Sequence, residues 1–189
     1  LQFKNNQLGS GYCAFWGFQG ESITALANLD TSNLTDNWGT NGMFRNCPNF
    51  NQDVSHFDMS NVTNMQEMFA FASAFNQPLN SWDTSSNTAT QNMFWNATAF
   101  NQPLDQWDTS NATRFSGTFN EATVFNQPLD NWDTSNAENM SSMFKNAQAF
   151  DQDISGWCVE QIDSKPSNFD AGAGFVGQTA KQPQWGVPC

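Results

Sequence analysis

The chain has 189 residues and a mass of 21.1 kDa, and its 18 Asp and Glu against 6 Lys and Arg give a formal net charge of -12. Because nucleic acids and anionic membranes are bound through basic surfaces, this shortage of base disfavours both as partners, while it permits a cationic partner or a divalent metal. The apolar stretches are only a few residues long, so we expect no membrane span and no signal peptide, and interpret the chain as a mature or trimmed secreted domain.

Residues 1–20 are predicted to form an N-terminal cap, because a 25-residue repeat is recognisable only after them. The repeat is marked by phenylalanines that lie 25 residues apart and are each followed by Asn-Gln or Asp-Gln: Phe50, Phe75, Phe100, Phe125 and Phe150. Repeats of this length are typical of solenoids, in which each unit buries its apolar face against its neighbours. We therefore expect residues 21–162 to form about six stacked coils, and residues 163–189 to form a C-terminal cap of the same domain.

Each coil is predicted to contain a short extended segment around "WDTS", a short helical turn around "NMxxMF" and a return loop through "FNQPL". The 3-1-3 spacing of Met65, Met68, Phe69 and Ala72 suits one inward face of a helical turn. Two further columns are predicted to point inward, one aliphatic and one aromatic: Val54, Leu79, Leu104, Leu129 and Ile154, and Phe57, Trp82, Trp107, Trp132 and Trp157. The Asn and Gln that follow each Phe are expected to pair along the stack, which is a structural role. The expected fold is thus a leucine-rich-repeat-like solenoid with short parallel β segments.

Four cysteines stand near the two ends of the chain: Cys13, Cys47, Cys158 and Cys189. No CxxC motif or Cys/His cluster is present, so disulfides are the preferred interpretation, and they imply an oxidising compartment. Of the three possible connectivities, Cys13 with Cys47 and Cys158 with Cys189 is favoured, because terminal units must cover the exposed ends of the core.

The stretch "FDMSNVTNMQEMFAFASAFNQ" from Phe57 to Gln77 resembles the repeat of the BspA-like leucine-rich-repeat surface proteins, which also occurs in mycoplasma lipoproteins and in secreted marine bacterial proteins. The resemblance covers about residues 29 to 189, including a C-terminal cap. It implies an extracellular, non-enzymatic protein associated with surfaces, adhesion and protein binding, for which the family has no single established ligand. Thr90 and Thr118 stand where that repeat has methionine, so the coils near them are expected to be looser or wetter.

One aspartate per coil forms a column of like charges about 5 Å apart: Asp58, Asp83, Asp108 and Asp133. Either an Asx turn or a calcium ion between coils would compensate this repulsion. The Asp-Thr-Ser-Asn context favours the turn. We therefore expect no cofactor and keep calcium as an alternative.

Two threonine columns suggest a flat hydroxyl face, which makes ice binding an alternative function: Thr84, Thr109 and Thr134, and Thr63, Thr88 and Thr113. Met59 interrupts the first column and Glu138 the second. Catalysis has little support, because no nucleophile elbow, phosphate loop or metalloprotease motif is present, so we predict that the chain is not an enzyme.

The favoured function is adhesion or binding at a cell surface or in the extracellular space, with a protein or glycan as partner. Contacts are predicted at exposed positions that differ between coils: Glu67, Trp95, Arg114, Glu121 and Lys145. Trp95 is notable because an exposed indole stacks well on a sugar or a partner side chain. We expect a monomer, with self-assembly into a structural surface layer as a further alternative.

Overall fold

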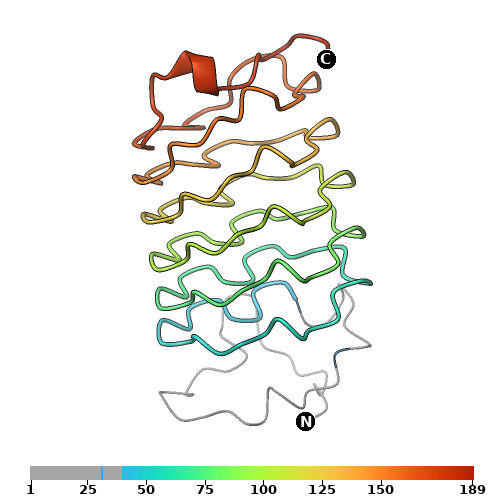
Figure 1. Ribbon diagram of the computed structural model, residues 1–189, viewed down its shortest axis with the longest axis vertical. Coiled ribbons are helices and arrows are strands. Elements are labelled where there is room, and N and C mark those ends of the chain that lie inside the picture. Colours follow the sequence, from blue (N-terminus) through green and yellow to red (C-terminus); the bar gives the residue numbers. More distant parts are fainter. Residues whose placement is uncertain (1–30, 32–39) are drawn as a thin grey trace.

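The computed structural model in Figure 1 describes Thr31 and residues 40–189, and the predicted cap at residues 1–20 lies outside them. The chain winds into coils that lie one above another, from residue 40 to the C-terminus (Figure 1). Single-residue parallel bridges join Asn64 to Ala89, Ala89 to Arg114, and Arg114 to Asn139. Each bridge spans 25 residues, so equivalent positions of successive coils lie above one another.

Regular secondary structure is scarce in the part of the chain that the structure describes. Its one helix is the 3-10 helix η1, Thr179–Lys181, in the C-terminal region, and its parallel pairing is limited to the three single-residue bridges. The bridges lie at the start of the "NMxxMF" segment, although the extended segment was expected around "WDTS". Hydrogen bonds of turns and between coils therefore take the place of strands and helices.

The "NMxxMF" segment, residues 64–72 and their equivalents in the other coils, forms what we call the turn ladder. Its backbone N–H groups alternate in direction. The N–H groups of Met65 and Glu67 donate to the next coil, where the carbonyls of Ala89 and Gln91 accept them at 2.9 Å each. Those of Met68 and Ala70 donate three residues back along their own coil, at 3.3 and 3.0 Å. Residues that bond within their own coil thus alternate with residues that bond to the next coil.

This alternation replaces the short helical turn that the 3-1-3 spacing predicted. Glu67 and Phe71 have φ of 58° and 61°, in the left-handed region, so no continuous helix forms. The same two positions are left-handed in other coils, at Gly42 and Asn46, Asn92 and Asn96, Gly117 and Glu121, and Ser142 and Asn146. The helical prediction was wrong because alternating turns also place the 3-1-3 residues on one face.

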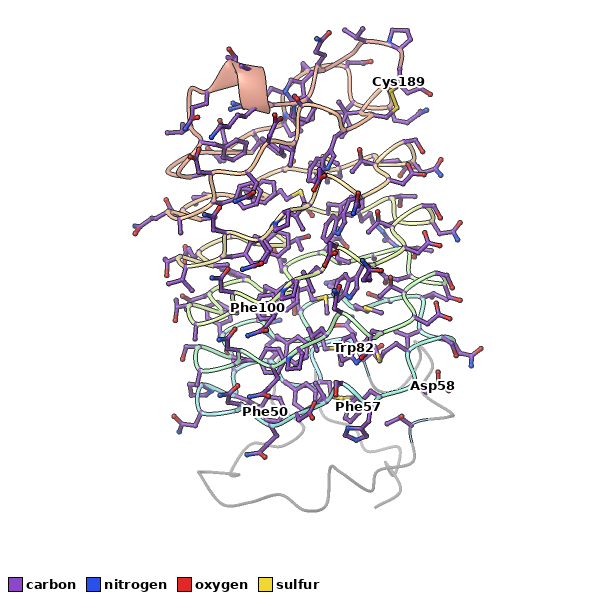
Figure 2. The ribbon with its side chains drawn as sticks, in the orientation of Figure 1. Phe50, Phe57, Asp58, Trp82, Phe100 and Cys189 are labelled. Carbon is purple, nitrogen blue, oxygen red and sulfur yellow. A yellow bond between two sulfur atoms is a disulfide. The ribbon has the colours of Figure 1, made fainter. Side chains whose placement is uncertain are left out.

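The core of the stack is made of aromatic columns, parts of which are visible in Figure 2. Rings of the Phe75 column stack on the next coil at centroid distances of 5.7 to 5.9 Å, and those of the Trp82 column at 6.2 to 6.3 Å. The indole N–H of Trp107 donates to the carbonyl of Leu79 on the preceding coil at 3.0 Å. One residue from each of the three inward columns of a single coil, Phe125, Leu129 and Trp132, shows the predicted burial.

The amides form a second ladder on the rim of the stack. The Oδ1 of Asn101 accepts the backbone N–H of Asn126 at 2.9 Å and the side-chain N–H of Gln127 at 3.0 Å, and the neighbouring coils repeat the pattern. The ladder ends at Asp151, where Lys181 and Gln178 of the C-terminal region donate to the carboxylate at 2.7 and 2.8 Å. Asp151 stands where the other coils have Asn, and its carboxylate accepts a lysine ammonium in place of the backbone N–H that the next coil donates elsewhere.

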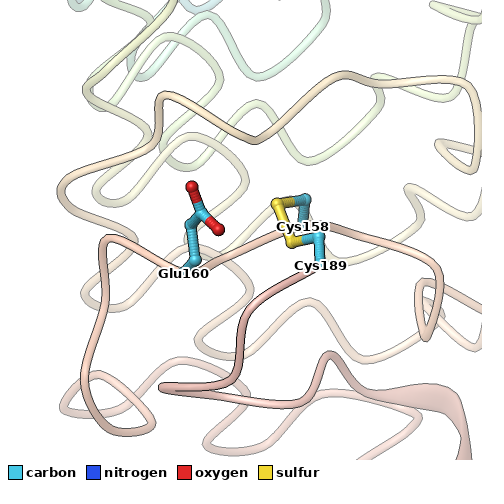
Figure 3. A group of neighbouring side chains, drawn as sticks. All are labelled: Cys158, Glu160 and Cys189. Carbon is cyan, nitrogen blue, oxygen red and sulfur yellow. A yellow bond between two sulfur atoms is a disulfide. The ribbon is translucent and has the colours of Figure 1, made fainter.

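The C-terminal region closes the stack. Ser142 and Phe144 of the turn ladder donate their N–H groups to Ser167 and Phe169, which therefore act as one more coil. A disulfide joins Cys158 to Cys189, as predicted (Figure 3). Cys47 is buried and also disulfide-bonded. Its predicted partner, Cys13, lies outside the described residues, so that pairing stays a prediction.

Candidate functional site

The outward positions of the turn ladder gather most of the predicted contact residues. Glu67, Trp95, Glu121 and Lys145 all lie there, each half-buried, and Arg114 lies exposed at the bridge where the ladder begins. Two columns define what we call the ladder face, and Ala70 is the one member that is buried: Arg45, Ala70, Trp95, Asn120 and Lys145, and Asn46, Phe71, Asn96, Glu121 and Asn146, together with Glu67. The structure thus brings four of the five predicted residues onto one face.

An ion pair begins this face. Arg45 and Glu67, on neighbouring coils, join through Nη1 and Oε2, and their side chains are 26% and 17% exposed. Ion pairs that solvent still reaches contribute little to stability, typically below about 1 kcal/mol, because solvent screens them. The pair does neutralise both charges locally. Glu67 is therefore part of the ladder face as one half of an ion pair, and its role in binding stays a prediction.

Next to the ion pair stands an aromatic pair. The rings of Phe71 and Trp95 lie 4.5 Å apart between centroids and are tilted by 55°, and both side chains are half-buried. The backbone N–H of Phe71 also donates to the carbonyl of Trp95 at 2.7 Å. Sequence reasoning found Trp95 and missed Phe71. The available signal was an aromatic residue in a column whose other members are polar: Asn46, Asn96, Glu121 and Asn146.

Three residues of the face adopt a backbone conformation that their type disfavours. Glu67, Phe71 and Glu121 have φ between 58° and 61°, whereas other coils place Gly or Asn at most of the equivalent positions. Left-handed backbone is costly for side chains other than Gly, Asn and Asp, on the order of 1 kcal/mol. The residue types at these positions are therefore not explained by backbone preference.

Unpaired polar atoms are concentrated in one column of the face. Among the described residues, the buried side-chain nitrogen and oxygen atoms without a hydrogen-bond partner are Arg45 Nε, Trp95 Nε1 and Asn120 Oδ1. All three belong to the Arg45 column, although the core elsewhere pairs its polar atoms. Such atoms are costly to leave unsatisfied in a native protein. The column thus holds two donors and one acceptor without partners.

The aspartate column is compensated by turns. Asp83 Oδ1 accepts the backbone N–H of Ser85 at 3.0 Å and its hydroxyl at 2.6 Å, and the other three aspartates bind the equivalent serines in the same way. These hydrogen bonds from Ser60, Ser85 and Ser135, the hydroxyl first, lower the pKa of Asp58, Asp83 and Asp133. The four carboxylates do not meet in one group of ligand atoms. The Asx turn is therefore the compensation that the structure displays, and calcium stays a prediction.

The first threonine column is buried, contrary to its proposed part in an ice-binding face. Thr84, Thr109 and Thr134 are 2%, 4% and 1% exposed. Their hydroxyls donate to backbone carbonyls of the next coil, at 2.7 to 3.0 Å. The sequence did not reveal this, because a hydroxyl serves equally well as a surface group and as a tie between coils. The second column is half-buried: Thr63, Thr88 and Thr113. Ice binding stays a prediction for this column only.

A group of potential metal ligands lies at the C-terminal region, where Figure 3 shows Cys158, Glu160 and Cys189 together. Both sulfurs are bonded to each other, so neither is a thiolate that could bind a metal. This group therefore holds the C-terminal region to the coils.

Stacked coils in a 25-residue register define the molecule as a repeat protein. The chain belongs to the family described as Mycoplasma protein of unknown function, DUF285, whose model matches residues 14–116 and 88–182. Neither the curated proteins nor the solved structures include a match. Within the described residues, none of the helices has the length and apolar character that crossing a membrane requires.

Proposed function

We propose that the chain is an extracellular or cell-surface binding module with a leucine-rich-repeat-like solenoid fold, which recognises a protein or glycan partner through the ladder face. The resemblance of its repeat to BspA-like surface proteins supports this function, and membership of the DUF285 family agrees with that resemblance. The Cys158–Cys189 disulfide supports an oxidising location, because such bonds persist outside the cytosol. The proposal is for a binding protein rather than an enzyme.

The observation that carries this proposal is the contrast between the columns. Core and rim columns repeat the same residue types, because stacking requires identical partners one above another. The ladder face places Arg, Ala, Trp, Asn and Lys in a single column, and it holds residues in unfavourable backbone conformations. Local rules are typically broken at functional sites. We therefore assign binding to the positions where the coils differ.

A glycan and matrix-protein array, run with and without calcium, tests the proposal. We expect the wild-type chain to bind a defined ligand, and the Trp95→Ala/Glu121→Ala variant to lose that signal. Asn131→Ala is the matched control, since Asn131 is exposed and lies in another column. Equal binding by all three proteins would place the site elsewhere, and a signal that requires calcium would bring the aspartate column into the site.

A further inference from the structure

We propose that the ladder face binds a neutral glycan at Trp95 and Asn120, with one sugar hydroxyl bridging the indole N–H and the amide oxygen. This inference rests on the proposed function and assigns a ligand class to the same face. Phe71 extends the site as a second aromatic ring. The two residues that join Trp95, namely Phe71 and Asn120, were not among the contacts that the sequence indicated.

The aromatic pair supplies the surface on which a sugar ring would lie. In the coils described from residue 40 to residue 162, the other tryptophans are core residues with exposures of 3% or 4%. Trp95 is half-buried and lies against Phe71, so part of both rings faces solvent. A partly exposed aromatic pair next to polar groups is characteristic of binding surfaces.

The unpaired atoms select the chemistry of the ligand. Trp95 and Asn120 occupy the same column on adjacent coils, which the N–H of Asn96 joins by donating to the carbonyl of Asn120 at 2.8 Å. The indole offers only a donor, and the Oδ1 of Asn120 offers an acceptor. A hydroxyl accepts from the first and donates to the second at once. Ammonium and guanidinium groups only donate and carboxylates only accept, so neither satisfies both atoms.

Charge on the face also favours a neutral ligand. Arg45 is paired with Glu67, and Glu121 lies beside Lys145, whose carbonyl accepts its backbone N–H at 2.7 Å. The four side chains sum to zero, although the whole chain carries -12. Neither a strongly basic nor a strongly acidic partner is attracted here by net charge.

Binding requires a local movement, because both unpaired atoms are shielded from solvent in the free protein. The Asn120 side chain is half-buried and turns about two bonds, so it is the group that gives way. A ligand hydroxyl then provides the partners that the free protein lacks.

Titration with soluble oligosaccharides of β-glucan, β-mannan and chitin, followed by calorimetry, tests the inference. At least one should bind the wild-type chain. Trp95→Phe, which keeps a ring and removes the N–H, should weaken binding about tenfold, and Asn120→Ala about equally. Trp95→Ala should abolish it. Thermal unfolding of each variant checks that the fold is retained, and Asn131→Ala should bind like wild type.

The outcomes separate this inference from the proposed function. If no saccharide binds, or if Trp95→Phe and Asn120→Ala both bind as tightly as wild type, the glycan assignment is overturned. A polylysine peptide that binds at Trp95 in place of sugars also overturns it. A matrix protein whose binding Trp95→Ala/Glu121→Ala abolishes would keep the proposed function while the glycan assignment falls. No ligand of any kind would remove both.

Discussion

A buried hydroxyl pair joins two neighbouring coils at positions where other coils of this chain have methionine. Thr90 and Thr118 are both fully buried, and their Oγ1 atoms lie 3.1 Å apart. The Thr118 hydroxyl also lies within hydrogen-bonding distance of the carbonyls of Phe115, at 2.8 Å, and Thr90, at 3.1 Å. The coils at this point are thus closed by hydrogen bonds, whereas the substitutions alone suggested looser or wetter packing.

This pair predicts unequal effects of two similar substitutions. Thr118→Val removes the hydroxyl to which Thr90 is bonded and leaves a buried polar group unpaired, at a cost of about 1 to 3 kcal/mol. Thr90→Val leaves Thr118 bonded to Phe115, so its cost should be below about 1 kcal/mol. The double variant should be more stable than Thr118→Val alone. Urea unfolding measures all three, and equal losses in both single variants would show that the pair is not coupled as described.

Glu121 offers the clearest test of backbone strain on the ladder face. Its φ is 60° and the same column holds Asn in three other coils, so Glu121→Asn should stabilise the fold by about 1 kcal/mol. For a chain of this size that corresponds to a rise in Tm of about 2 to 4 °C. Asn96→Glu, the reverse exchange one coil earlier, is the control and should lower Tm. A lower Tm for Glu121→Asn would mean that the glutamate side chain stabilises the coil.

At the scale of the element, the Asx turns make stability depend on pH. Serine hydroxyls and N–H groups lower the pKa of Asp58, Asp83 and Asp133 below the ordinary value of 3.8. A lowered folded pKa gives stability that is present above about pH 4 and is lost as the pH falls through the lowered value. The Ser60→Ala/Ser85→Ala/Ser135→Ala variant should therefore lose less stability below pH 4 than wild type. Chemical unfolding at a series of pH values measures this. The same dependence of the unfolding free energy on pH in both proteins would show that the Asx turns do not cause it.

The turn ladder also shows where reasoning from sequence reached its limit. Inward columns such as Phe125 and Trp132 could be predicted, because their spacing alone requires a common side of the stack. The conformation of the segment around Met65 and Met68 could not, since a helical turn and alternating turns bury the same residues. Glycine at Gly42 and Gly117 was the available signal, because it marks positions with positive φ.

For a related reason, only part of the candidate site could be predicted from the sequence. Differences between coils identified Trp95 and Glu121, but the burial of the Thr84 column depends on hydrogen bonds between coils that composition does not reveal. Phe71 was overlooked because aromatic residues in this chain are mostly core residues. Unpaired atoms such as Asn120 Oδ1 become visible only when the positions of neighbouring coils are known.

At the scale of the whole molecule, the Cys158–Cys189 bond fixes the end of the stack. It closes a loop with a sequence separation of 31, which corresponds to about 3 to 4 kcal/mol of stabilisation in the chain-entropy view. Cys158→Ala/Cys189→Ala should lower the free energy of unfolding by that order. Circular dichroism during urea unfolding measures the loss, and Asn131→Ala serves as the control. An unchanged midpoint would show that packing alone holds the C-terminal region.

The repeated columns build the stack, and we propose that the ladder face binds the ligand. A variant that gives these four positions residues found in the same columns of other coils, Glu67→Asn/Phe71→Asn/Trp95→Ala/Glu121→Asn, tests this on the glycan and matrix-protein array. We predict that this variant stays folded by circular dichroism and loses the ligand that the wild-type chain binds. Retained binding at wild-type affinity would contradict the claim.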